Sequence, residues 1–91
     1  MFYLHLGEKQ MVPLRDVIAL INAENPLPPD TADVVDKAEA ERKLVTLTEE
    51  EKTKTLVICE KHVYRSPISS NTLYKRAMDN IWEEKNESTG K

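Results

Sequence analysis

Residues 63–77, VYRSPISSNTLYKRA, mark the passage from an extended segment to a helix, and the expected fold is built around that passage. Pro67 disfavours helical geometry at Ser66, so we expect a strand before the proline and a helix after it. A short polar side chain is needed to cap that helix. The candidates for the cap are Ser69, Ser70, Asn71 and Thr72. Four candidates exceed what one cap needs, so an anion bound at the helix start is a second interpretation.

The helix after Pro67 has a broad apolar face, formed by two rows of side chains at a spacing of four residues. The rows are Leu73, Ala77 and Ile81, and, one position on, Tyr74, Met78 and Trp82. Three uses of that face are open: a core contact, a contact between subunits, or a platform on which nucleic-acid bases stack. We expect it to hold subunits together, and we expect residues 86–91 to form a disordered tail.

The rest of the chain is dominated by short extended segments. The segment 2–6, FYLHL, alternates as a half-buried strand does, and 11–22, MVPLRDVIALIN, is typical of a second extended stretch. Further short strands are expected at 44–47 and 55–59, and a strand at 63–65 would complete a hairpin with the preceding one.

One short helix is expected in the middle of the chain, at residues 31–43. Asp30 is a suitable N-cap, acidic residues lie toward the start, and Arg42 and Lys43 lie at the end, which suits the helix dipole. The predicted order is therefore β-β-α-β-β-β-α. This order describes a single small α+β domain with antiparallel strands over residues 1–85.

The net charge of −3 conceals an uneven distribution of charge along the 91 residues. Residues 24–51 hold nine acids and three bases, whereas residues 52–76 hold six bases and one acid. Exposed charges are screened beyond about 8–10 Å, so the local sign matters more to a polyanion than the total charge does. A nucleic-acid partner is therefore compatible with this acidic chain.

Six basic side chains are candidate contacts to such a partner. Arg15 stands just before an apolar strand, and Lys52 and Lys54 lie in a loop beside three glutamates. The remaining candidates are Arg65, Lys75 and Arg76. Simpler interpretations exist for the first three: Arg15 as a solvated residue paired with Asp16, and the two lysines as part of a charge-paired loop.

The single cysteine, Cys59, cannot form a disulfide within the chain, which favours a reducing cytoplasm. Cys59 and His62 have a spacing found in metal sites, but too few further ligands accompany them. A buried strand cysteine and a turn histidine are therefore expected. The chain has two glycines, Gly7 and Gly90, and no glycine-rich phosphate loop. We accordingly expect no enzyme active site, no metal and no cofactor.

A membrane location is not expected either. No stretch approaches the roughly 20 apolar residues of a membrane span. The opening MFYLHLGEK lacks the basic region followed by an apolar run that a signal peptide has, and it is better interpreted as a strand. These features predict a cytoplasmic protein.

Two segments, residues 1–21 (MFYLHLGEKQMVPLRDVIALI) and residues 63–77, resemble the RemB group within the RemA/RemB-like family of extracellular matrix regulatory proteins. The resemblance is carried by the YLHLG opening, the VP step before an Arg-Asp pair, and the segment SPISSNTLYKRA. It implies a small α+β fold, ring-like or other homo-oligomers, and no catalysis. It also implies activation of matrix or biofilm genes in bacteria through double-stranded DNA.

The resemblance assigns roles to individual residues as well. Arg15 matches an arginine that contacts DNA in RemA relatives, just before the second apolar strand. Adjacent arginines of a later loop contribute there, and in this chain that loop is TEEEKTK, with Lys52 and Lys54 beside Glu49–Glu51. We therefore expect Arg15, Lys52 and Lys54 to contact phosphates. Further candidates for such contacts are Arg65, Lys75 and Arg76.

A protein-interaction module is the alternative hypothesis. In it, the acidic helix at 31–43 faces outward and the apolar face from Leu73 to Trp82 contacts a related regulator, without any contact to DNA. A continuous positive rim on the surface would favour DNA, whereas alternating patches would favour a protein partner.

Overall fold

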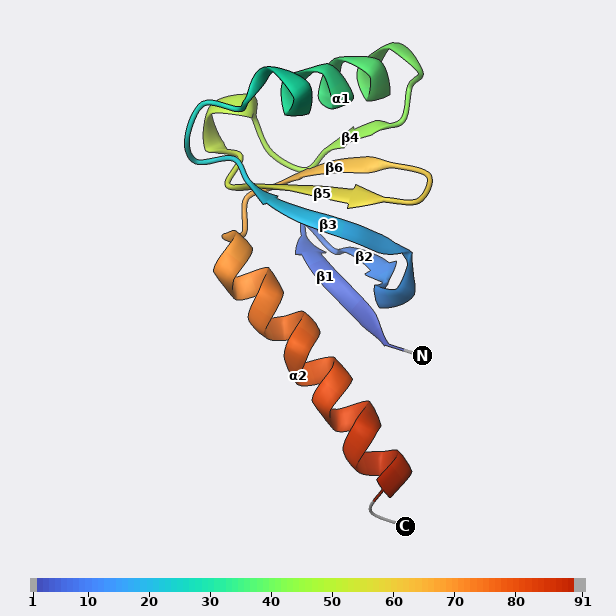
Figure 1. The fold of residues 1–91 in the computed structure, drawn as a ribbon. Helices are drawn as coiled ribbons and strands as arrows, with labels where there is room; N and C mark the ends of the chain where they lie inside the picture. Colours follow the sequence, from blue (N-terminus) through green and yellow to red (C-terminus); the bar gives the residue numbers. More distant parts are fainter. Residues whose placement is uncertain (1, 90–91) are drawn as a thin grey trace.

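The computed structural model describes residues 2–89, and it describes side chains for residues 2–81. Within these residues, six strands form two sheets and two α-helices flank them (Figure 1). The prediction of an α+β domain is confirmed. Neither of the described helices combines the length and the apolar composition that crossing a bilayer requires.

The first sheet is a hairpin of β1 (Tyr3–Gly7) and β2 (Gln10–Pro13). Its inner face buries Leu4 and Leu6, as the alternating pattern predicts. Pro13 ends β2 in this two-stranded sheet, where both strands are edges and a missing N–H is tolerated.

The second sheet has four strands in the order β3-β5-β6-β4. The strands are β3 (Val17–Asn22), β4 (Leu44–Thr46), β5 (Thr55–Cys59) and β6 (Val63–Ser66). Neighbours are antiparallel except for β4 and β6, which are parallel, so the prediction of antiparallel strands is wrong for this pair. The parallel pairing is possible because the chain passes through η2 and β5 between the two strands.

The second extended stretch predicted at 11–22 consists of two strands in different sheets. A 3-10 turn, η1 (Leu14–Asp16), separates them and moves the chain from the hairpin to the four-stranded sheet. The first residue of η1 donates its backbone N–H to the carbonyl of Phe2 at 2.8 Å, and its last residue accepts from the N–H of Glu60 at 3.0 Å. The turn is thus tied to both sheets.

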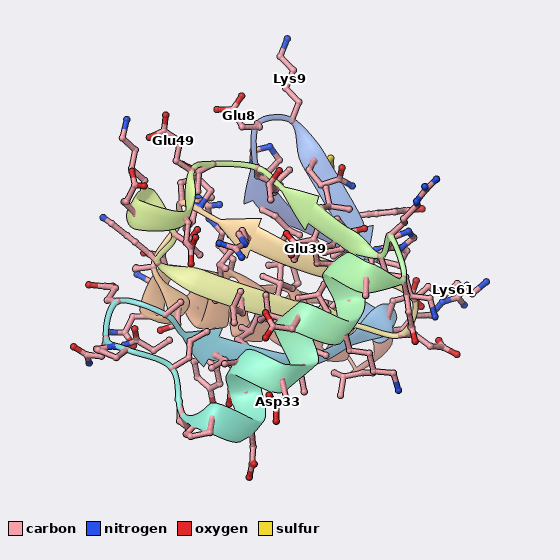
Figure 2. The ribbon with its side chains drawn as sticks, turned by 90° about the horizontal axis from the view of Figure 1, so that it is seen from above. Glu8, Lys9, Asp33, Glu39, Glu49 and Lys61 are labelled. Atoms are coloured by element: carbon pink, nitrogen blue, oxygen red, sulfur yellow. The ribbon has the colours of Figure 1, made fainter. Side chains whose placement is uncertain are left out.

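The middle helix, α1 (Pro29–Ala40), covers one face of the four-stranded sheet (Figures 1 and 2). It begins before the expected cap, because Pro29 occupies the first turn and Asp30 already lies inside the helix. Proline is favoured there, since the N–H it lacks would have no partner in the helix. The predicted N-cap role of Asp30 is therefore wrong.

The end of α1 also differs from the prediction, since the helix stops at Ala40 and not at residue 43. Arg42 has a φ of 60°, in the left-handed region. Its N–H donates to the carbonyl of Glu39 at 3.1 Å, and the N–H of Lys43 donates to that of Ala38 at 2.7 Å. This pair of bonds is that of a Schellman motif, in which glycine is the usual left-handed residue.

The last helix, α2 (Ser70–Thr89), lies on the other side of the four-stranded sheet, beside β1, and projects beyond the body of the domain (Figure 1). The molecule is accordingly elongated, at 47 × 25 × 23 Å. The helix covers part of the segment 86–91 for which a tail was predicted, and residues 90–91 lie outside the described part of the chain.

Gly7 packs closely against the segment where β6 leads into α2, because a Cβ on Gly7 would lie 3.2 Å from the Pro67 ring. Gly7 also has a φ of +106°, so both features favour glycine there.

The core lies between the hairpin, the four-stranded sheet and the start of α2. Its buried members are Leu4, Leu6, Val12, Val57, Cys59, Tyr64 and Leu73. Ser66 is fully buried beside them, and its hydroxyl donates to the carbonyl of Leu6 at 2.7 Å and accepts from the N–H of Ile68 at 3.1 Å. This hydroxyl joins the two sheets through satisfied polar groups.

Candidate nucleic-acid interface

The backbone of Arg15 is fixed in place, whereas its side chain is exposed to solvent. It lies within η1, which is tied to both sheets, and its side chain is 72% exposed. Its charge partner is Asp16, with 4.0 Å between Nε and the carboxylate oxygen. An exposed pair at that distance contributes little, so the guanidinium is available to an external anion.

Lys52 is the last residue of the 3-10 turn η2 (Glu50–Lys52), and Lys54 follows it two residues later. Both are exposed, and the Nζ of Lys52 lies 3.9 Å from the carboxylate of Glu49. The backbone of Lys54 is fixed, because its N–H donates to the carbonyl of Ser66 at 2.9 Å. The predicted charge pairing in this loop is therefore confirmed for Lys52, and it is a weak, solvated pairing.

The structure does not bring Arg15 and the two lysines together. The ladder between β3 and β5 begins beside Arg15 and ends beside Lys54. A six-residue strand spans about 20 Å, so the two groups are separated by that length or more. In Figure 2, Glu49 beside η2 and Lys61 near η1 lie at different ends of the sheet. A single chain thus offers two separate small basic sites at opposite ends of this sheet.

The remaining predicted contacts are divided between the interior and α2. Arg65 lies on β6 with only 14% of its side chain exposed, so it offers little to a DNA backbone. Lys75 and Arg76 are exposed on α2. One guanidinium nitrogen of Arg76 donates to the carbonyl of His5 on β1 at 3.2 Å, which ties the helix to the hairpin.

The start of α2 is capped by Ser69, which confirms the capping interpretation for one of the four candidates. Its hydroxyl accepts from the N–H of Thr72 at 3.3 Å and donates to the Thr72 hydroxyl at 2.9 Å. The hydroxyl of Thr55 donates to the carbonyl of Ile68 at 2.7 Å, so the helix start lies at the same end of the sheet as Lys54. An anion at this helix start stays a prediction.

The side chains of the apolar face predicted for contact between subunits differ in their burial. Leu73 is fully buried in the core and Ala77 packs against it, so Leu73 cannot contact a partner and its assignment to an interface is wrong. Tyr74, Met78 and Ile81 are exposed to 61%, 44% and 47%. The side chain of Trp82 lies outside the described residues.

Cys59 is buried on β5, and His62 is exposed in the turn that follows, as predicted. Burial, and to a lesser degree the charge of Asp16, raises the pKa of the Cys59 thiol to about 11. The thiol is therefore protonated at neutral pH and is a poor nucleophile. The His62 ring instead lies against Tyr64, with 6.0 Å between the ring centroids.

The amino-acid sequence of this domain matches that of known proteins. Residues 3–77 match the family described as RemA-like, extracellular matrix regulatory protein A-like. The chain belongs to the RemA-like family. Over 75 residues it is 29% identical to extracellular matrix regulatory protein B of Bacillus subtilis (strain 168), an alignment that covers 82% of this chain and 89% of that protein.

The family match confirms the resemblance read from the two ends of the sequence, and it extends across the middle of the chain.

Two side chains that organise this RemA-like domain were not predicted from the sequence. Asn80 donates its side-chain amide to the carbonyl of Tyr3 at 3.2 Å, and with Arg76 it covers the outer edge of β1. Ser66 joins the two sheets. A polar residue one turn after Arg76 on the same helix face is the signal that could have indicated Asn80.

The outer face of α1 is acidic. The outward-facing residues of α1 include Asp33 and Glu39, and Glu49 precedes η2 at one end of the same side (Figure 2). Lys37 is the exposed base in the last turn of α1. These carboxylates would repel a polyanion, so the outer face of α1 is unfavourable for a contact with DNA.

Proposed function

We propose that this chain is a regulator of extracellular-matrix genes that binds double-stranded DNA as a homo-oligomer in the bacterial cytoplasm, without catalysis. Membership of the RemA-like family, over residues 3–77, is the observation that carries the proposal. In support, the resemblance to RemA relatives matches Arg15 with an arginine that contacts DNA there, and the Arg15 side chain is 72% exposed with one weak charge partner.

The separation between Arg15 and the lysines favours binding by an oligomer. One chain offers few phosphate contacts, and they lie about 20 Å or more apart. Copies held together would repeat these contacts along a duplex, and repeated weak contacts strengthen one another through effective concentration. Tyr74, Met78 and Ile81 form the exposed apolar face on α2 that we assign to the contact between copies.

The test is a fluorescence-anisotropy titration of duplex DNA at several salt concentrations, with the mass of the protein measured by light scattering. We expect an oligomer whose logarithmic affinity falls with the logarithm of salt at a slope of about −0.9 per phosphate neutralised. Arg15→Glu should weaken binding by tenfold or more at low salt, because repulsion replaces a phosphate contact in every copy.

Lys37→Glu is the matched control, because it changes the net charge by the same amount on the acidic α1 side. We expect this variant to bind DNA nearly as the unmodified protein does. Equal weakening by both substitutions would mean that net charge, and not the position of Arg15, governs binding. A folded oligomer that binds no DNA at low salt would refute the proposal.

The acidic surface of α1 favours one second candidate, a protein-interaction module that works with another regulator. Asp33 and Glu39 face outward on that helix (Figure 2). In this case the protein alone would not bind the duplex, and a related regulator added to it would restore binding. The same titration, repeated with and without that regulator, separates the two functions.

A further inference from the structure

Arg65 is a buried cation without a full set of partners. It projects from β6 on the sheet face toward α1, opposite Leu56 of β5, and 14% of its side chain is exposed. Its Nε is buried and has no hydrogen-bond partner among the described residues. The nearest carboxylate is that of Glu50, which is 3.7 Å from Nη1 and 83% exposed. A buried donor without an acceptor is costly, so the unpaired Nε of this mostly buried side chain favours the binding of an anion.

A cavity of about 650 Å³ opens beside this guanidinium. Its walls come from the loop 23–27, α1, η2 and β5. Apolar side chains contributing to the walls are Ala23, Leu27, Ala32, Val35 and Leu56. The volume lies in the range of small-molecule sites, and an apolar cavity with one convergent charged group is the usual form of such a site.

The charges around the cavity limit which anion it can hold. Apart from Glu50, the charged residues that line it are balanced: Lys52, Lys54 and Arg65 against Glu24, Asp36 and Glu51. With Glu50 included, a dianion such as phosphate would meet four carboxylates, whereas a single carboxylate adds less negative charge and can take the place of Glu50 beside Arg65 when that side chain turns to solvent. The planar guanidinium also matches a carboxylate in geometry.

We propose that this cavity binds an organic monocarboxylate. The ligand carboxylate accepts hydrogen bonds from Arg65, the Glu50 side chain turns outward to solvent, and the apolar body of the ligand contacts Leu27, Val35 and Leu56. Two of the proposed DNA contacts, Lys52 and Lys54, also line this cavity, but the carboxylate site rests on Arg65 and the apolar walls and does not depend on DNA binding. Solvent filling the cavity is the alternative, and it would satisfy Nε without giving any preference for a ligand.

The test is an NMR titration of the full chain with phenylacetate, a small aromatic monocarboxylate. The Nε–Hε group of Arg65 is observed directly, with relaxation-optimised spectra because the proposed oligomer exceeds the 10.4 kDa of one chain. We expect saturable shifts of that group and of the Val35 and Leu56 amides, with a dissociation constant on the order of millimolar for so small a probe. Neutral phenylacetamide and inorganic phosphate should bind at least about tenfold more weakly.

Two variants make the assignment specific. Glu50→Gln removes the competing carboxylate from an exposed position, so it should bind phenylacetate about two- to fivefold more tightly. Arg65→Met keeps an extended side chain and removes the charge, so it should lose the response. If phenylacetamide binds as well as phenylacetate, or if Glu50→Gln leaves the affinity unchanged, the Arg65 carboxylate site is refuted. Absence of saturable shifts at Arg65 would refute it as well.

Discussion

The two faces of the four-stranded sheet are built differently. The face toward the hairpin and α2 packs Val57, Cys59 and Tyr64 against fully buried leucines. The face toward α1 holds a cavity of about 650 Å³ beside Leu56 and the partly satisfied Arg65. Close packing on one face gives the domain its stability, whereas looser packing on the other leaves room for a ligand.

The largest expected effect compares the same truncation on the two faces. Leu6 is 0% exposed on the packed side and Leu56 is 2% exposed on the α1 side. Leu6→Ala should lower the free energy of unfolding by about 4 kcal/mol, and Leu56→Ala by about 2 kcal/mol. The difference is expected because Leu56 already borders a cavity that solvent can enter, so its removal creates less new empty space.

Denaturant unfolding at one protein concentration measures both values, and unchanged m-values serve as the control that the transitions remain comparable. Equal losses in the two variants would show that the α1 side is as tightly packed in solution as the hairpin side. The contrast between the faces would then fail.

The second expected effect is a dependence of stability on alkaline pH that comes from the packed face. Burial raises the pKa of Cys59 from 9.0 to about 11, so between these values the unfolded thiol loses its proton while the folded one keeps it. The unfolded state then binds fewer protons, and stability falls as pH rises from 9 to 11, by up to about 1.4 kcal/mol per pH unit.

Cys59→Ala should unfold with a weaker dependence on pH over that range, measured by denaturant titrations at pH 8 and pH 10.5 in the presence of a reductant. Burial also raises the pKa of Tyr64, which is retained in both proteins, so some alkaline loss should persist in the variant. An identical decline in the two proteins would show that the thiol does not keep its proton when the chain is folded.

Features that depend on a local pattern could be predicted from the sequence, and features that depend on a distant contact could not. The alternation around Leu4 and Leu6 predicts β1, and Pro67 predicts the place where β6 gives way to α2. The 3-10 turn at 14–16 escaped prediction because Phe2 and Glu60 hold it, and neither is a near neighbour in the pattern.

The candidate site follows the same division. Exposure of Arg15 and Lys52 follows from their charge and from the turns in which they lie. Their separation by the length of β3 depends on the pairing of β3 with β5, which no single segment reveals. The low exposure of Arg65 likewise depends on segments that are distant in sequence, namely the loop 23–27, α1 and η2, which meet beside it, whereas the sequence alone predicts a surface contact for a basic residue in a strand.

The smallest expected effect concerns two residues with left-handed backbone, one on each side of the sheet. Lys9 has a φ of 64° in the β1–β2 turn, and Arg42 has a φ of 60° at the end of α1. That region costs a residue with a side chain roughly 1 kcal/mol. Lys9→Gly should therefore stabilise the domain by about 1 kcal/mol, since glycine is favoured in two-residue hairpin turns with positive φ.

Arg42→Gly should stabilise by less, roughly 0.5 kcal/mol. Glycine removes the backbone strain at the left-handed position of the Schellman motif. The substitution also removes a cation that interacts favourably with the C-terminal end of the α1 dipole. Thermal and denaturant unfolding of the two single variants and the double variant measure these terms. The two sites lie in different turns, one between β1 and β2 and one after α1, so the gains should add. A loss of stability in Arg42→Gly would mean that the arginine side chain holds the end of α1 more strongly than the strain opposes it.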